Sequence, residues 1–89
     1  MNQQKSLFAD QSPTLDEVMS VWDETRLEWM SRAQIAERLG RAKSPALIAV
    51  IGVCVGMGFL AVKNEILPNR ANYYLYQPTK KWWDTEYPF

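Results

Sequence analysis

The chain has 89 residues, a formal net charge of zero and 47% hydrophobic residues, which allows one small domain with a compact core. Its single cysteine, Cys54, excludes an internal disulfide, and the absence of histidine removes Ser-His and Cys-His nucleophilic pairs and the commonest metal ligand. A glycine-rich phosphate loop is also absent, so we expect no enzymatic activity, no catalytic residues, no metal site and no cofactor.

Charge is distributed unevenly along the chain. Residues 1–30 carry six acidic and two basic side chains, whereas residues 31–72 carry six basic and two acidic ones. The second segment therefore has a net charge of +4 (six minus two), which favours an anionic partner there. Residues 1–5 lack the apolar stretch of a secretory signal, and we expect a cytoplasmic protein.

The first helix is predicted to begin at Pro13 and Thr14, after a polar and flexible arm over residues 1–11. Thr14 followed by Glu17 matches a capping box. Apolar residues recur at helical spacing and define one buried face: Leu15, Val18, Met19 and Trp22. Residues 24–30 are predicted to form a linker or a short strand that packs on the core.

A second helix is predicted over residues 32–39. Ser31 is placed to cap its start, and Gln34 stands three residues later, where a capping box has Glu or Gln. Gly40 is the expected stop signal.

A third helix is predicted to begin at Ser44 and Pro45, with serine as the N-cap and proline at the first helical position. Its predicted core stripe consists of Leu47, Val50, Ile51, Cys54 and Met57. Two helices joined by a tight turn make a helix-turn-helix, whose second helix usually enters a DNA groove.

The period of the pattern then changes from helix to strand. Residues 60–67 alternate in part, residues 68–72 are turn-forming, and residues 73–77 are aromatic and favour β-structure. These segments predict a β-hairpin with a loop of about five residues.

Residues 30–47, with Gly58–Leu60 as the end of the third helix and a hairpin over 60–76, resemble a winged helix-turn-helix domain of the kind found in small bacterial, archaeal and phage transcription regulators. The resemblance covers roughly residues 14–77. It implies an α+β fold in which three helices are followed by a two-stranded hairpin, the wing.

The expected domain organisation follows from this resemblance. The arm over 1–11 precedes a winged domain over 12–79, and an aromatic tail over 80–89 follows it. The implied function is binding of double-stranded DNA by a homodimer that acts as a small transcription regulator or accessory factor.

The resemblance also assigns DNA contacts to three places in the chain. The start of the second helix is expected to touch the DNA backbone through Ser31, Arg32 and Gln34. The start of the third helix is expected to meet phosphates or bases through Arg41, Lys43, Ser44 and Pro45. The hairpin tip is expected to reach phosphate or the minor groove through Asn69, Arg70 and Asn72.

The outward face of the third helix departs from the family pattern. It carries no side chain able to form paired hydrogen bonds with bases, since it consists of Ile48, Ala49, Gly52, Val53 and Gly56. Sequence readout would then depend on the helix start, on thymine methyl groups or on DNA shape. Alternatively, this face is buried in a homodimer or against a partner protein, and the winged domain serves protein contact only.

A membrane span is another alternative. Residues 46–62 form a 17-residue run without charge between Lys43 and Lys63, and Gly52 and Gly56 have the spacing used for close helix packing in bilayers. A span needs about 20 apolar residues, with a lower limit near 17. On this interpretation the chain is a single-pass subunit of a membrane complex.

The tail over residues 80–89 has four aromatic side chains among its last eight residues. So much apolar area favours burial, either against the core or against a dimer or partner protein. Cys54 is predicted to be an inert buried thiol.

Overall fold

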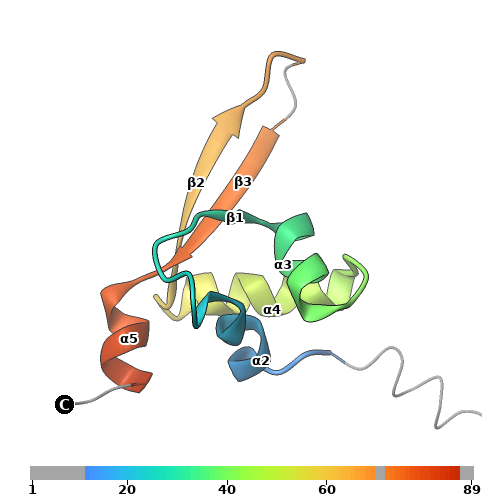
Figure 1. Cartoon of the computed structure of the whole chain (residues 1–89). Coiled ribbons are helices and arrows are strands. Elements are labelled where there is room, and N and C mark those ends of the chain that lie inside the picture. The colour runs from blue at the N-terminus through green and yellow to red at the C-terminus, as the bar shows by residue number, and fades with distance from the viewer. Residues whose placement is uncertain (1–11, 70–71, 87–89) are drawn as a thin grey trace, which may run out of the picture.

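The computed structural model describes residues 12–69 and 72–86, which form an α+β fold (Figure 1). Its elements in chain order are the helix α2 (Leu15–Met19), the 3-10 helix η1 (Ser20–Trp22), the strand β1 (Met30–Ser31), the helices α3 (Arg32–Leu39) and α4 (Pro45–Gly56), the strands β2 (Leu60–Ile66) and β3 (Asn72–Pro78), and the helix α5 (Lys80–Glu86).

The three strands form one antiparallel sheet in the order β1-β3-β2. β2 pairs with β3 along its whole length, from Leu60 opposite Pro78 to Ile66 opposite Asn72. β1 pairs only with the base of β3, at Tyr76 and Leu75. The outer part of the hairpin therefore consists of two strands and projects away from the helices, whereas its base lies beside α4 (Figure 1).

The helices begin where their capping residues predict. In the α2 capping box, the Thr14 N–H donates to Glu17 Oε1 at 2.7 Å, and the Glu17 N–H donates to Thr14 Oγ1 at 3.1 Å. Ser44 Oγ accepts the Leu47 N–H at the start of α4. Gly40 ends α3 with φ of 70°, a left-handed conformation that a residue without Cβ adopts easily.

The core lies between α2, α3 and α4 and the base of the sheet. The largest fully buried side chains include Trp22, Met19, Met30, Ile35, Leu47 and Ile51. The Trp22 indole N–H donates to the Glu28 carbonyl oxygen at 2.8 Å, so burying this ring leaves no unpaired donor. The predicted stripe of α4 is confirmed at Leu47, Ile51 and Cys54, but Met57 is 46% exposed because α4 ends at Gly56 and the chain turns there.

The predicted count of three helices and two strands is corrected by two elements of the described structure. β1 adds a third strand, formed where the segment expected as a linker or short strand meets β3. α5 makes much of the expected tail a helix, and Trp82 within it is buried in an edge-to-face contact with Phe59, at 5.2 Å between ring centroids. Through Trp82 the described part of the tail packs on the core, whereas residues 87–89 and the expected arm over 1–11 lie outside the described residues.

The uncharged run over residues 46–62 is not one helix. α4 ends at Gly56, Gly58 adopts φ of 83° in the following turn, and β2 begins at Leu60. Across residues 12–69 and 72–86, no helix has the length and apolar character needed to cross a membrane.

Candidate functional site

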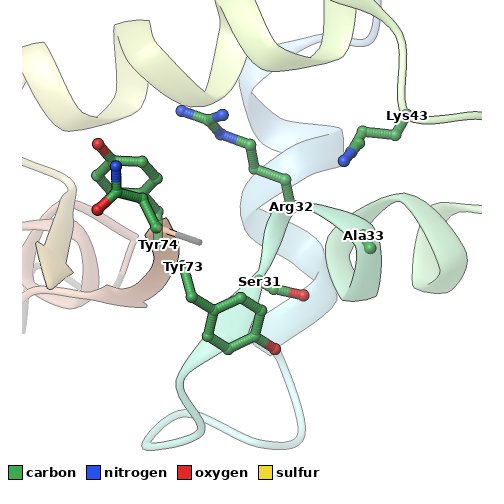
Figure 2. A pocket seen from close by; sticks show the side chains of 7 residues that line it. Ser31, Arg32, Ala33, Lys43, Tyr73 and Tyr74 are labelled. Carbon is green, nitrogen blue, oxygen red and sulfur yellow. The ribbon is translucent and has the colours of Figure 1, made fainter. Parts of the chain in front are cut away.

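A pocket with a volume of about 130 Å³ lies where the start of α3, the loop before α4 and the hairpin meet (Figure 2). Its lining residues are Ser31, Arg32, Ala33, Lys43, Asn72, Tyr73 and Tyr74. Four of the residues predicted from the sequence to contact DNA are among them, namely Ser31, Arg32, Lys43 and Asn72.

Arg32 is held in place by two tyrosines of β3. Its Nε donates to the Tyr76 hydroxyl oxygen at 3.0 Å, and its guanidinium carbon lies 5.2 Å from the centroid of the Tyr74 ring. None of the ion pairs in the described part of the chain involves Arg32. An arginine has five N–H donors, so this arrangement orients the guanidinium and leaves most of its donors available to an anion.

Lys43 is the second cation of the pocket. Its side chain is exposed, and no carboxylate of the described residues forms an ion pair with it. Figure 2 shows the ends of the Arg32 and Lys43 side chains on the same side of the start of α3.

Two other cations of the described chain, Arg38 and Lys80, are neutralised by neighbouring acids. Arg38 contacts both carboxylate oxygens of Glu28, at 3.1 and 3.2 Å, and Lys80 contacts Asp84 at 2.6 Å. The pocket therefore gathers two positive charges that lack an acidic partner, which makes it a favourable place for an anion.

The start of α3 contributes its backbone to the same place. In its capping box the Ser31 N–H donates to Gln34 Oε1 at 2.8 Å, and the Gln34 N–H donates to Ser31 Oγ at 3.2 Å. The polar atoms of Ser31 and Gln34 thus stabilise the helix end, and Ser31 is buried. The helix dipole adds partial positive charge at this end, beside Arg32.

The remaining predicted residues are spread around this site. Ser44 caps α4, and Pro45 is exposed at its first position. The pKa of Glu17 is lowered mainly because its carboxylate accepts the backbone hydrogen bond from Thr14. The positive charge of Arg41 makes a smaller contribution to the same lowering. Asn69 lies apart from the pocket in the hairpin turn, and Arg70 is outside the described residues.

Sequence reasoning missed three residues that line the pocket: Ala33, Tyr73 and Tyr74. The sequence assigned the two tyrosines to an aromatic, β-favouring segment of the hairpin and did not include them among the predicted DNA contacts. A signal was present, because alternation along a strand places Tyr74 and Tyr76 on one face of β3. That face lies against Arg32.

A second hollow of about 400 Å³ adjoins the pocket, and we call it the α4–hairpin groove. Its lining residues are Arg32, Ile48, Gly52, Val55, Val62, Tyr74 and Tyr76. Arg32 and Tyr74 line both hollows, so the cationic pocket continues into a mostly apolar groove between α4 and the hairpin.

The thiol of Cys54 takes no part in either hollow. It is fully buried, and this burial raises its pKa from 9.0 to about 11, so at neutral pH the thiol is protonated and unreactive. Within residues 12–69 and 72–86, no group of three or more cysteine, aspartate or glutamate side chains is arranged to hold a metal ion.

No protein-family model, curated protein sequence or solved structure matches this chain. The assignment of a function therefore depends on the residues and geometry described above.

Proposed function

We propose that this chain is a winged helix-turn-helix domain that binds double-stranded DNA as a small transcription regulator or accessory factor, and hence acts in the cytoplasm. The order of elements supports the proposal, since α2, β1, α3 and α4 precede the hairpin of β2 and β3. The contact between α4 and β2 supports it too, because a wing lies beside the second helix of the motif.

The observation that carries the proposal is the pair of cations in the pocket. Arg32 and Lys43 come from the two helix starts that meet DNA in a helix-turn-helix, and neither has an acidic partner in the described chain. A guanidinium binds phosphate oxygens through paired N–H donors, and a lysine ammonium adds a point charge.

The contacts are expected to be mainly with the DNA backbone. The middle of α4 exposes Ala49, Gly52 and Val53, which offer no hydrogen bond to a base edge. We therefore place the DNA over the pocket, the start of α4 and the hairpin, where binding depends on phosphate charge and DNA shape.

The test is a titration of labelled duplex DNA with the full chain, followed by fluorescence anisotropy over a series of salt concentrations. Each lost phosphate contact lowers the slope of log affinity against log salt by about one. Arg32→Ala and Lys43→Ala should each weaken binding and reduce the slope by that amount. Lys80→Ala is the matched control, because Lys80 is an exposed lysine of α5 outside the pocket.

Thermal unfolding of each variant checks that the fold is retained, which matters most for Arg32 because of its bond to Tyr76. Unchanged affinity and slope in both folded pocket variants would contradict the proposal.

A second candidate function is protein contact without DNA. The exposed apolar side of α4 favours it, since Val53 is 52% and Met57 46% exposed. If the wild-type chain has no affinity for duplex DNA even at low salt, this second function is favoured.

A further inference from the structure

The strand β2 has one edge without a strand neighbour in the described chain, since it comes last in the sheet order β1-β3-β2. The side chains of its outer residues, 62–66, are exposed. Proteins commonly protect such an edge with proline or with a bulge. β2 has neither, because it pairs with β3 residue by residue and contains no proline. This edge is therefore able to accept another strand.

The charges along this edge are complementary to those of a second copy. Residues 62–66 are valine, lysine, asparagine, glutamate and isoleucine in that order. If two copies of this segment pair antiparallel about Asn64, Lys63 of each copy lies directly opposite Glu65 of the other. Opposite charges in directly opposite positions stabilise paired strands. The two Asn64 side chains also match, because an amide both donates and accepts hydrogen bonds.

Within one chain, Lys63 and Glu65 satisfy each other only weakly. Lys63 Nζ lies 3.9 Å from Glu65 Oε2, and the two side chains are 43% and 52% exposed. An ion pair that is both long and exposed contributes little to stability. Both charged groups therefore remain able to form a second ion pair with a neighbouring strand.

We propose that two copies of this chain pair through their β2 edges, antiparallel and about a two-fold axis at Asn64. The two three-stranded sheets then become one sheet of six strands. In a two-fold interface each patch meets its own copy, so the patch must be complementary to itself. Main-chain hydrogen bonds between the two edges supply the binding, and the side chains set the partner and the register.

The charges also select one register. Directly opposite residues of paired strands lie on the same face of the sheet, so the axis of a symmetric pair falls at a residue and not between two residues. An axis at Lys63 would set two lysines against each other, and an axis at Glu65 would set two glutamates against each other. Like charges in these positions destabilise the pair, which leaves Asn64 as the favoured centre.

The apolar side chains of β2 fit the same register. Val62 and Ile66 are 45% and 73% exposed, and alternation along the strand places both on the face that adjoins the α4–hairpin groove. Pairing about Asn64 sets Val62 of each copy opposite Ile66 of the other. Cross-strand pairs of β-branched side chains stabilise a sheet, so the dimer covers apolar area that a single chain leaves in water.

The opposite edge of the sheet is a poorer place for a second copy. Residues 72–74 of β3 lie beyond the pairing with β1, but they line the cationic pocket together with Arg32 and Lys43. Pairing there would bring like charges together. No residue of β2 lines that pocket, so the proposed dimer leaves the pocket accessible and does not rest on the proposed DNA binding.

The test measures the mass of the full chain without DNA, by sedimentation and light scattering from micromolar to millimolar concentration. We expect a concentration-dependent dimer. Lys63→Glu places two acids in every cross-strand charge pair of the dimer, and Glu65→Lys places two bases there. Each variant should raise the dimer dissociation constant by at least about 10-fold.

Restoring the charge pairs separates this interface from a general effect of charge. In an equimolar mixture of Lys63→Glu and Glu65→Lys, every cross-strand pair again joins opposite charges, so the mixture should form a heterodimer. The exchanged double variant Lys63→Glu/Glu65→Lys should dimerise like the wild type. The matched control is Glu37→Lys, which makes the same change of net charge as Glu65→Lys at an exposed position of α3 and should not affect dimerisation.

Three outcomes would overturn the proposal. The first is a wild-type chain that stays monomeric throughout the concentration range, as it would if the edge binds a strand of a different protein. The second is single variants that dimerise as well as the wild type. The third is single variants that lose the dimer while neither the mixture nor the exchanged variant recovers it.

Melting temperatures in dilute solution check that each variant is folded, which matters for Lys63 because its Nζ lies 4.5 Å from the centroid of the Trp29 ring. Amide hydrogen exchange of the wild type needs no variant. Amides of residues 62–66 that point away from β3 should exchange more slowly in concentrated than in dilute solution, and equal exchange rates refute the pairing. Because no DNA is present, absence of DNA binding leaves these results unchanged.

Discussion

Replacing Trp82 with alanine tests whether α5 is part of the folded core. Trp82 is 6% exposed, and its ring meets Phe59 at an interplanar angle of 65°. Truncating a buried tryptophan to alanine costs about 3–5 kcal/mol, of which the edge-to-face contact accounts for about 0.5–1.5 kcal/mol.

That loss is large for a chain of 89 residues. At 0.05–0.15 kcal/mol per residue, the whole free energy of unfolding is about 4–13 kcal/mol. Since 1 kcal/mol shifts the melting temperature of a small domain by at least about 4 °C, we expect Trp82→Ala to lower it by about 12 °C or more.

Two further variants separate packing from other effects in the same denaturant titration, followed by circular dichroism. Trp82→Phe keeps a ring against Phe59 and removes an indole N–H that has no acceptor among the described residues, so it should cost less than about 1.5 kcal/mol. Trp83→Ala removes a half-buried ring that lies 4.4 Å from the Arg26 guanidinium and should cost less than Trp82→Ala. A loss below about 1 kcal/mol for Trp82→Ala would refute the reasoning.

Two other predictions concern backbone conformation and the buried thiol. Gly40→Ala should lower the free energy of unfolding by about 1–2 kcal/mol because φ is 70° there, while Gly40→Asn should cost less, and denaturant titration compares the two. Cys54 should resist alkylation at neutral pH until the chain unfolds, as a thiol-labelling time course will show. Burial in the folded chain raises the pKa of the Cys54 thiol from 9.0 to about 11, so as the pH rises the thiol ionises first in the unfolded chain. The free energy of unfolding therefore falls as the pH rises between these two values. The fall should be at most about 1.4 kcal/mol per pH unit and absent in Cys54→Ala, and equal pH dependence of the two chains would contradict it.

Local signals in the sequence predicted much of the fold. Ser31 with Gln34, and Ser44 with Pro45, act over three residues or fewer, so they can be recognised without knowing what lies nearby in space. Each of these helices begins where its cap predicts. The hairpin followed from a strand pattern interrupted by turn residues, which is also a local signal.

The parts that were missed depend on distant residues. β1 is two residues long and has no period of its own, and its pairing with β3 joins Met30 to Tyr76. Likewise, the sequence indicated Arg32 as a site residue but not the tyrosines that orient it. The contact joins α3 to β3, which are distant in the sequence, so no local pattern of residues predicts it. The expected contact of Ser31 with DNA stays a prediction, although its hydroxyl is already engaged in the helix cap.

The strand order has a consequence for how the protein is made. β3 lies between its two partners in the sheet, yet it is the last strand to be synthesised. β1 cannot pair until Leu75, the partner of Ser31, has been synthesised. The nascent chain therefore has helices but no complete sheet until residues 72–78 have left the ribosome. Pairings so distant in sequence raise the contact order and slow folding. A chain that stops before β3 should therefore remain a target for proteases, since one missing strand removes every pairing in the sheet.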